Sequence, residues 1–384
     1  MTQQIRLGVV GFGWMGQTHA RALMRVPLHY PDLPAVPQLA VVADNAPDDR
    51  LRLATDTYGF DRGITDWREL VESDDVDVVS VTGPNFIHAE VAVAAARAGK
   101  HLWVEKPAGR SAAETRTIVQ AAQESRVHSA VGFNYRNPPA VEYARSLIAD
   151  GRIGEVKHVR VRMFGDYAAH PEGAHTWRFT RELAGTGVTG DLGSHGIDLA
   201  EYVVGPIASL IAQDATFITH RPTSEGAASH FSRGGGGPLR EVENEDYVSM
   251  LLRFAGGAKG VLEASRASVG EQNNYGFEIH GATGALAWDF RRMGELQVCL
   301  DQDYQAANWS PVLISPGIAE FAAFQPDAGI ALSYDDLKVI EAKRLLESIV
   351  TGQPPGANIG DALRAAEIAE AAKSAIPTEG WVHL

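Results

Sequence analysis

The sequence predicts an α/β domain built on a doubly wound parallel sheet, followed by a second α+β domain with a large, open, mainly antiparallel sheet. Up to about residue 133, short apolar segments alternate with helical stretches, which is typical of a parallel sheet covered on both faces. Beyond residue 134, several strand-like segments are joined by short glycine-containing turns, which indicates antiparallel pairing. A chain of 384 residues is long enough for two domains, expected at 1–133 and 134–384.

In the first domain, strands and helices are expected to alternate. The expected strands are the apolar runs at 5–10, 39–44, 76–82, 101–105 and 128–133. A helix that begins at Trp14 should end before Pro27, and an alanine-rich helix at 87–98 should end at Gly99. Ser111 and Glu114 form a capping-box pattern that should open a further helix.

In the second domain, a helix at 139–150 should precede a series of strands. The strands are expected at 156–163, 207–217, 247–254, 258–264, 275–280, 285–290 and 295–300, and helices at 337–350 and 362–375, where they can pack back on the first domain. A large sheet needs cover on its second face, and this region shows no supply of amphipathic helices for it. We therefore expect a homodimer or homotetramer formed through this sheet.

Residues 219–245 interrupt the strand pattern and include consecutive glycines at 234–237. A solvated, flexible excursion is one interpretation of this segment. A lid over an active site is the other, and the composition favours neither.

The composition limits the classes of partner and compartment. A formal charge of −14, with no run of Lys or Arg, argues against nucleic acid and anionic membranes as partners. Cys299 is the single cysteine, so an intrachain disulfide and a four-thiolate zinc site are both excluded. The first strand begins by Ile5, which leaves no room for a signal peptide, and no apolar run approaches membrane length. We expect a cytoplasmic protein.

The most informative motif is the glycine pattern that follows the first expected strand. Residues 11–16 read Gly-Phe-Gly-Trp-Met-Gly. Gly11 permits a tight turn, Gly13 lets the backbone approach a pyrophosphate, and Gly16 lets the next helix pack closely on the sheet. A coincidental glycine turn is the alternative, but the strand before the motif and the helix after it favour a dinucleotide-binding fingerprint.

Asp44 closes the second expected strand and is the candidate to bind the adenosine ribose. It lies farther from Gly16 than the roughly 20 residues usual for this fingerprint. We attribute the excess to an inserted loop containing Pro27, Pro31, Pro34 and Pro37. A carboxylate at this position would repel a 2′-phosphate, which favours NAD, although the nearby Arg50 leaves NADP possible.

Polar residues follow two further strands of the expected parallel sheet. Thr82, Pro84, Asn85 and His88 come after one strand, and Glu105-Lys106-Pro107 after the next. The carboxyl edge of such a sheet is where ligands bind. Pro107 cannot extend the strand, so Lys106 should be held at this edge, although a surface lysine in a turn is the plainer interpretation.

A third segment, 185–198, combines glycines with Asp191, His195 and Asp198. On a continuous α-helix these three residues share one face. A metal site is disfavoured because glycines rather than further ligands surround them. Asp191 as a helix N-cap and His195 as a satisfied buried histidine are the structural alternatives.

Together, the glycine fingerprint, Pro84-Asn85 with His88, Glu105-Lys106-Pro107 and the pair Asp191 and His195 resemble the Gfo/Idh/MocA family of NAD(P)-dependent oxidoreductases. The resemblance implies a Rossmann domain, an α+β domain with an open sheet, and Lys106, Asp191 and His195 as the catalytic group. Within the family, 134–136, 177–179 and the loop near residue 230 are similar to the sugar dehydrogenase branch that includes levoglucosan dehydrogenase.

The resemblance implies a set of ligand-binding residues and no metal. The residues expected at the dinucleotide are Gly11, Phe12, Gly13, Trp14, Met15, Gly16, Asp44, Thr82, Pro84, Asn85, His88, Glu105 and Lys106. Those expected at a carbohydrate or cyclitol substrate are Lys106, Tyr135, Arg136, Trp177, Arg178, Asp191 and His195.

The expected reaction is hydride transfer between a secondary hydroxyl of a cyclic sugar, anhydrosugar or inositol and the nicotinamide. His195 would take the hydroxyl proton, Lys106 would hydrogen-bond the reacting oxygen, and Asp191 would orient substrate and imidazole. An NAD-dependent glycosidase and a non-catalytic sugar-sensing regulator of the same fold are the alternatives.

Overall fold

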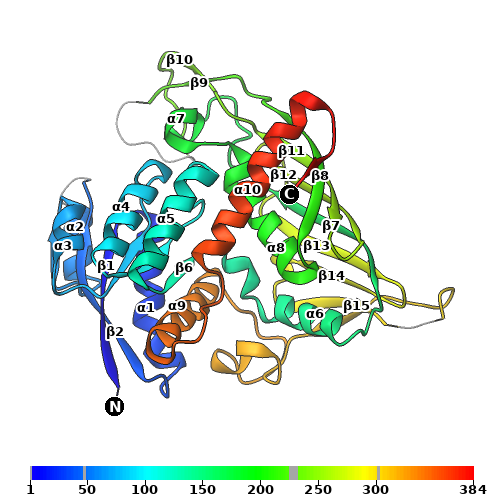
Figure 1. Ribbon diagram of the computed structural model, residues 1–384, viewed down its shortest axis with the longest axis horizontal. Coiled ribbons are helices and arrows are strands. Elements are labelled where there is room, and N and C mark those ends of the chain that lie inside the picture. Colours follow the sequence, from blue (N-terminus) through cyan, green and yellow to red (C-terminus); the bar gives the residue numbers. More distant parts are fainter. Residues whose placement is uncertain (1, 46–48, 225–231, 301–302) are drawn as a thin grey trace. The chain divides into compact units, whose positions relative to one another are not determined.

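The computed structural model describes residues 2–45, 49–224, 232–300 and 303–384 (Figure 1). The chain forms two compact units: unit 1 is Met1–Asn137 with Leu332–Arg364, and unit 2 is Pro138–Ala331 with Ala365–Leu384. A single division after residue 133 would assign 332–364 to the second domain. In the structure this segment belongs to unit 1, so a C-terminal helix completes the N-terminal domain.

Unit 1 contains a six-stranded sheet in the order β3-β2-β1-β4-β5-β6. Its strands are β1 (Gln3–Val10), β2 (Ala35–Ala43), β3 (Arg62–Ile64), β4 (Val78–Val81), β5 (His101–Val104) and β6 (Ser129–Val131). All neighbouring pairs are parallel, which confirms the doubly wound sheet. The edge strand β3 was not expected, because three residues are too few to form a recognisable apolar run. Two of the three residues are exposed.

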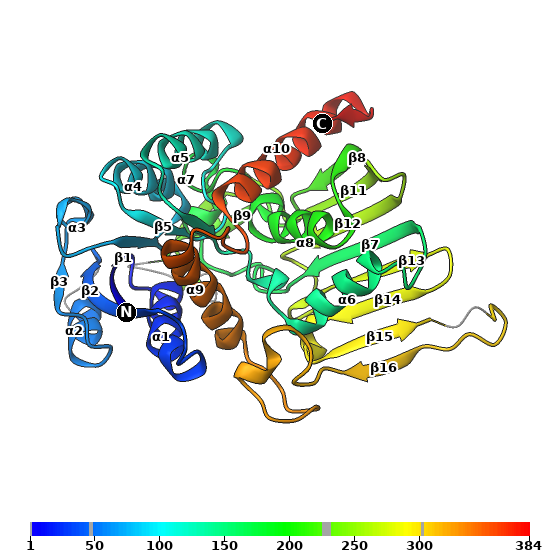
Figure 2. The ribbon, with the colours of Figure 1, turned by 60° about the horizontal axis from the view of Figure 1, so that its bottom comes forward.

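Helices cover both faces of this sheet. They are α1 (Trp14–His29), α2 (Asp49–Asp56), α3 (Trp67–Glu72), α4 (Asn85–Arg97), α5 (Ala112–Ser125) and α9 (Tyr334–Thr351). α1 packs with α9 on one face, and α4 packs with α5 on the other (Figure 2). The small side chains of Ala92, Ala95 and Ala96 are buried, which lets α4 lie close to its neighbours.

The expected proline-rich insertion after the first helix is shorter than the sequence suggests: Pro31 and Pro34 lie in the connection between α1 and β2, but Pro27 and Pro37 do not. Pro27 lies inside α1, which continues to His29, and Pro37 lies inside β2. A proline near a helix end removes few hydrogen bonds. Pro37 pairs with Ile5 of β1, whereas β3 pairs with β2 only from Val41 onward, so Pro37 sits where β2 is an edge.

The expected capping box of α5 is half formed. The Ser111 hydroxyl accepts a hydrogen bond from the Glu114 N–H at 3.1 Å. The Glu114 carboxylate instead accepts from the backbone N–H and guanidinium of Arg110. The competing arginine therefore replaces the reciprocal half of the motif.

Unit 2 contains a nine-stranded sheet in the order β16-β15-β14-β13-β7-β12-β11-β8-β17. Its strands are β7 (Val156–Phe164), β8 (Ile207–Ala215), β11 (Tyr247–Phe254), β12 (Lys259–Ser265), β13 (Asn274–Gly281), β14 (Ala285–Asp289), β15 (Glu295–Cys299), β16 (Ser310–Leu313) and β17 (Val382–His383). β7 and β12 pair in parallel, and the other neighbours are antiparallel. The mainly antiparallel sheet is thus confirmed.

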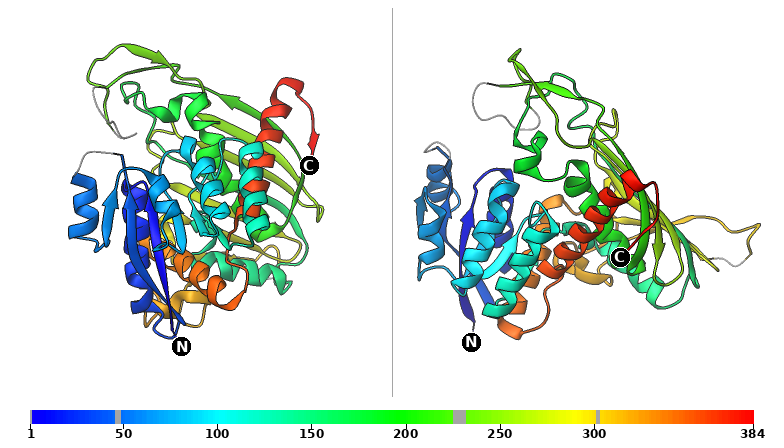
Figure 3. Two further views of the ribbon diagram at one scale, coloured as in Figure 1. Left: turned by 60° about the vertical axis from the view of Figure 1, so that its left-hand side comes forward. Right: turned by 45° about the horizontal axis from the view of Figure 1, so that its top comes forward.

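One face of this sheet is covered from within the unit. The helices α6 (Pro139–Ala149) and α8 (Ser194–Val204) pack against it (Figures 2 and 3). In β11, Val248, Met250 and Leu252 are buried, while the alternating Leu251 keeps 51% of its surface exposed. The alternation indicates one apolar face toward the helices and a second face toward solvent.

The interrupting segment 219–245 contains a small hairpin formed by β9 (His220–Pro222) and β10 (Leu239–Glu241). Residues 225–231, within the expected lid or excursion, lie outside the described part. Two further helices of the chain are α7 (Arg181–Ala184), which lies before α8, and α10 (Ile359–Ala375), which lies near the C-terminus. Among the described residues, a helix with the length and apolarity needed to cross a membrane is absent.

A buried ion pair ties the hairpin segment to the sheet of unit 2. Asp246 accepts from Arg266 Nε at 2.8 Å and from the backbone N–H groups of Phe217 and Ile218. Both charged groups are almost fully buried. The Arg266 guanidinium lies on one ring, Phe179, that Arg221 also contacts.

Asp246→Ala should lower the free energy of unfolding by about 3–5 kcal/mol, because it leaves the buried Arg266 without its carboxylate. Glu155→Ala, which removes an exposed partner of Lys157, should cost less than about 1 kcal/mol. Urea denaturation followed by circular dichroism measures both changes. Equal stability of the two variants would contradict a structural role for the buried pair.

Candidate active site

The glycine turn after β1 has the three properties that the sequence predicts. Gly11 has φ +90°, and a Cβ there would lie 2.7 Å from Gly83. A Cβ at Gly16 would overlap the carbonyl oxygen of Gly11, whereas a Cβ at Gly13 would meet nothing within 4 Å. Gly11 and Gly16 are therefore required by the turn itself, while Gly13 faces open space where a ligand can approach the backbone.

The turn also suits an anion. Gly13 caps α1 without a side-chain hydrogen bond, and the first turn of α1 carries no acidic residue. The N–H groups of such a helix end attract phosphate oxygens. These features fit the pyrophosphate of a dinucleotide. Trp14 and Met15 begin the helix beside this turn, and Trp14 is largely exposed.

Asp44 follows β2 and is directed to the same turn. Its Oδ2 accepts from the Phe12 N–H at 2.6 Å, and Arg50 Nη1 lies 3.5 Å from that oxygen. Asp44 is buried, so its carboxylate is fixed beside the glycine turn rather than in bulk solvent. This is the position from which an acidic residue bonds the adenosine ribose in this fold.

The loop after β4 joins the glycine turn. The Thr82 hydroxyl donates to the Gly11 carbonyl at 2.6 Å, and Pro84 precedes Asn85, the first residue of α4. Two of the strand loops that the sequence predicts at the carboxyl edge are therefore in direct contact. The strand order reverses between β1 and β4, and the carboxyl edge at such a reversal is the usual dinucleotide-binding position.

His88 holds two loops together. Its Nδ1 and Nε2 lie 2.8 Å from the carbonyl oxygens of Pro107 and Gly83. The ring is buried, and burial lowers the pKa of His88 although both carbonyls oppose this effect. A neutral ring has one N–H, so His88 donates to one of these two carbonyls at a time, and a direct contact with the cofactor stays a prediction.

The Glu105-Lys106-Pro107 segment follows β5 at the same edge. Glu105 Oε2 accepts from the backbone N–H of Lys106 at 3.2 Å. Glu105 itself is buried, and Lys106 is partly exposed. Lys106 therefore projects from a turn whose preceding side chain is fixed in the interior.

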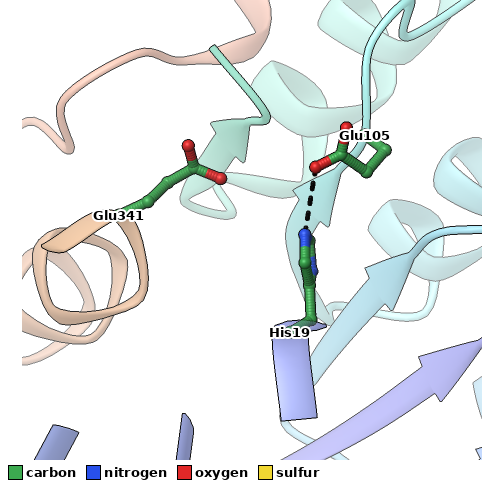
Figure 4. A group of neighbouring side chains, drawn as sticks. All are labelled: His19, Glu105 and Glu341. Atoms are coloured by element: carbon green, nitrogen blue, oxygen red, sulfur yellow. Dashed lines mark hydrogen bonds and ion pairs between the residues drawn. The ribbon is translucent and has the colours of Figure 1, made fainter. Parts of the chain in front are cut away.

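A buried polar network surrounds Glu105 (Figure 4). Glu105 Oε1 lies 3.0 Å from His19 Nε2 and accepts from Lys338 Nζ at 2.5 Å. Lys338 Nζ also donates to Glu341 Oε1 at 2.9 Å, and Glu341 Oε1 accepts from Trp103 Nε1. His19, Lys338 and Glu341 were not expected at the site. Lys338 and Glu341 belong to α9, where charged residues normally face solvent, and His19 lies inside α1, outside the motifs that the sequence offers.

Burial and the contacts within this network shift the pKa values of its ionisable groups. Burial lowers the pKa of His19 to about 4, so the neutral ring donates from Nε2 to Glu105 and accepts from the Ser80 hydroxyl at Nδ1. Burial opposes ionisation of Glu105, but the charge of Lys338 and the hydrogen bonds from His19 and Lys338 together outweigh it and hold the pKa of that carboxyl well below its usual range. Burial raises the pKa of Glu341 to about 6.

The same cluster is the one group among the described residues whose carboxylate and imidazole atoms lie close enough to ligate a metal: His19, Glu105 and Glu341. The Lys338 ammonium donates to both carboxylates. A cation already provided by the chain therefore lies between the two carboxylates, and we assign no metal to this cluster.

In unit 2, the expected continuous α-helix through Asp191 is wrong. Residues Thr189–Gly193 form a π-helical turn, and α8 begins only at Ser194. Gly193 occupies the N-cap of α8, so Asp191 does not cap this helix. Such turns often occur at functional sites. This one contains Asp191 and is followed directly by the first turn of α8, where His195 is buried.

Tyr167 fixes the Asp191 carboxylate. Its hydroxyl donates a short hydrogen bond to Asp191 Oδ2. Burial raises the pKa of Tyr167 well above its usual value, and the charge of Asp191 adds to this effect. Tyr167 was not identified from the sequence, because nothing in the alternation of β7 marks the residues after its end.

The expected substrate residues are divided between the units. Tyr135 is buried in unit 1, and Arg136 Nη2 lies 3.2 Å from Asp361 Oδ1 of α10. In unit 2, the Arg178 guanidinium stacks on Trp177 at 4.3 Å, and Asn244 Nδ2 donates to the Arg178 carbonyl. Unit 1 thus gathers the expected dinucleotide residues, and unit 2 holds Asp191 with His195.

Comparisons with known proteins identify the class. Residues 5–133 match the model described as "Oxidoreductase family, NAD-binding Rossmann fold", and residues 141–287 match the "GFO/IDH/MocA C-terminal domain". The chain belongs to the Gfo/Idh/MocA family of oxidoreductases, with an N-terminal NAD-binding Rossmann domain. The expected fold, family and NAD cofactor are therefore confirmed.

Particular relatives cover the whole chain. Levoglucosan dehydrogenase of Pseudarthrobacter phenanthrenivorans is 34% identical over 100% of this chain and 98% of its own. A solved levoglucosan dehydrogenase in complex with NADH and levoglucosan has a TM-score of 0.92 and 32% identity, with 99% of each chain covered. Myo-inositol 2-dehydrogenase of Thermotoga maritima is 23% identical over 99% of this chain and 98% of its own.

Gly13→Val should weaken NADH binding by at least about tenfold, because the added side chain would occupy the open space beside the turn. Its stability should change little, since a Cβ there meets no neighbour. Gly16→Val should instead lower the free energy of unfolding by about 1–3 kcal/mol through overpacking. Fluorescence titration with NADH and thermal unfolding separate these effects, and wild-type affinity in Gly13→Val would contradict the assigned site.

Proposed function

We propose that this enzyme uses NAD to oxidise a secondary hydroxyl of a cyclic sugar, anhydrosugar or inositol, and that the reaction is reversible. The observation that supports this most directly is the placement of Lys106 at the carboxyl edge of the Rossmann sheet, anchored through Glu105 beside the loop after β4. This edge is where ligands of doubly wound folds bind.

His195 is proposed as the base. When bound, the nicotinamide supplies the acceptor for hydride from the substrate carbon. Oxidation also releases the hydroxyl proton, and an imidazole has a proton affinity suited to accepting it near neutral pH. His195 is buried in the first turn of α8, directly after the π-helical turn that contains Asp191.

Lys106 and Asp191 are proposed to support this proton transfer. The Lys106 ammonium donates a hydrogen bond to the reacting oxygen and stabilises its developing negative charge. Asp191, fixed by Tyr167, orients the substrate and favours the protonated imidazole. Trp177, Arg178, Tyr135 and Arg136 are proposed to contact the sugar, although Arg136 already pairs with Asp361.

Levoglucosan is the first substrate to test. The most similar relatives reported above include a levoglucosan dehydrogenase and its complex with levoglucosan, and inositol dehydrogenases match at lower identity. The names of these relatives describe dehydrogenases, which favours net oxidation over glycoside cleavage or ligand sensing. A panel of levoglucosan, aldoses and inositols, assayed by NADH absorbance with NAD and NADP, tests this proposal.

His195→Ala and Lys106→Ala should each lower kcat by at least about 100-fold, because each removes a proton-transfer or charge-stabilising group. NADH affinity should change by less than about threefold in His195→Ala, because unit 1 alone holds the dinucleotide-binding turn. Stopped-flow absorbance and NADH titration measure these parameters. Near-normal kcat in both variants would remove these residues from the mechanism.

We propose that the chain works in the cytoplasm as a homodimer or homotetramer assembled through the sheet of unit 2. The solvent-facing side of β11 exposes Leu251, and Leu313 of β16 is also half exposed on this sheet. Apolar side chains on an uncovered sheet face favour association with a second copy.

Leu251→Glu should dissociate the assembly, because it introduces a charge into the proposed contact. Leu28→Glu replaces an exposed apolar residue of α1 in unit 1 and should leave the assembly unchanged. Size-exclusion chromatography with light scattering measures the mass of both variants. A monomeric wild-type protein, or an unaltered mass for Leu251→Glu, would contradict assembly through this face.

A further inference from the structure

The carboxylate of Glu105 is held by residues that lie far apart in the sequence. His19 approaches from α1, and Lys338 approaches from α9 in the returning C-terminal segment. Gly132, which follows β6, packs against it so closely that a Cβ would lie 2.5 Å from Oε1. The carboxylate therefore has a single well-defined position inside unit 1.

A further contact joins the Glu105 carboxylate to Lys106, the residue proposed to bind the reacting oxygen. Glu105 Oε2 accepts from the backbone N–H of Lys106, while Oε1 accepts from Lys338 Nζ. The next residue, Pro107, has no N–H, so its backbone cannot supply an alternative donor at this turn. The Lys338 ammonium and the Lys106 backbone N–H thus contact the two oxygens of one carboxylate.

Lys338 is held by two buried ion pairs. Its side chain is fully buried, and its ammonium donates to both Glu105 and Glu341. Glu341 is further fixed by Trp103 Nε1 at 2.6 Å. An ammonium removed from water in this way is retained only where it neutralises buried carboxylates.

Helix α9 is also tied to the helix of the glycine turn. Asp335 and Asp336 pair with Arg21 and Arg25 of α1, and the Tyr334 ring lies 5.4 Å from that of Trp14. Tyr334, Lys338 and Glu341 are spaced so that they share one face of α9. This face contacts both the glycine-turn helix and the support of Lys106.

We propose that Lys338 is a positioning residue for the dehydrogenase reaction, acting through Glu105 to hold Lys106 in its reactive place. The inference rests on the proposed role of Lys106. The C-terminal helix thereby sets the geometry of a residue that the N-terminal strand β5 presents, without Lys338 touching substrate or cofactor itself.

The test compares Lys338→Met with Lys343→Met. Lys343 lies on the same helix, pairs with Glu347 and lies over the Tyr30 ring. Neither contact involves Glu105, so its replacement controls for the loss of a helix lysine. We expect Lys338→Met to lower kcat for the best sugar of the panel by at least about tenfold, since small displacements of catalytic groups are costly. NADH affinity should stay within about threefold.

A second measurement follows Lys106 without catalysis. Hydrogen exchange of the Lys106 amide, measured by mass spectrometry on the cofactor-free protein, should accelerate in Lys338→Met and not in Lys343→Met. In a Glu105→Gln background, Lys338→Met should cause no further loss of kcat, because the path between them is already broken. Additive losses would show that Lys338 does not act through Glu105.

If Lys338→Met fails to fold, Lys338→Met/Glu341→Gln replaces it, because this pair removes one charge of each sign. Unchanged kcat and unchanged Lys106 exchange in a folded variant would overturn the inference. Lys106→Ala distinguishes the two proposals: full activity in that variant defeats the proposed role of Lys106, whereas an inactive Lys106→Ala beside a fully active Lys338→Met defeats only the positioning role.

Discussion

The buried ammonium of Lys338, shared by Glu105 and Glu341, is the interaction on which the nucleotide-binding unit depends. A carboxylate moved from water into a protein interior loses several kcal/mol of hydration unless close partners replace the water. Here the replacements come from His19, Lys338 and the Lys106 backbone. The unit is therefore not complete until the chain has returned from unit 2 to supply α9.

This dependence explains why the Rossmann sheet is served by a discontinuous segment. The helices α4 and α5 bury mainly small side chains and pack against each other on one face of the sheet. The face that carries α1 needs α9 as a second helix, and the ion pairs of Arg21 and Arg25 with α9 fix their alignment. Packing and charge thus specify the same arrangement, which is how a sequence selects one structure.

The sequence predicts the features that follow from local rules. The glycine turn, the parallel strands and the alternating strands of unit 2 depend on patterns of a few residues, and the structure contains them. Pro27 and Pro37 misled the interpretation, because a proline breaks an element only where its N–H is needed, and that need depends on neighbouring strands. β3 has too few apolar residues for any periodic pattern.

The buried network could not be predicted from the sequence for a different reason. Lys338 and Glu341 have the spacing of an ordinary solvated ion pair on a helix, and their burial depends on a strand more than 200 residues earlier in the chain. Similarly, the π-helical turn at Asp191 has the composition of an ordinary helix start. Tertiary contacts determine both the burial of Lys338 and Glu341 and the π-helical turn, and such contacts cannot be recognised from a few neighbouring residues.

The two proposed catalytic units hold their carboxylates in contrasting ways, and the contrast fits the chemistry required of each. Glu105 is paired with a full positive charge, which suits its proposed role of fixing the Lys106 backbone rather than influencing a proton. Asp191 accepts from the neutral hydroxyl of Tyr167, which orients the carboxylate and leaves its negative charge in place. In the proposed mechanism, a retained negative charge close in the chain to His195 would stabilise the imidazolium that forms when the substrate proton is taken up. A phenol therefore suits this position better than a lysine, because a cation there would oppose the proton transfer proposed for His195.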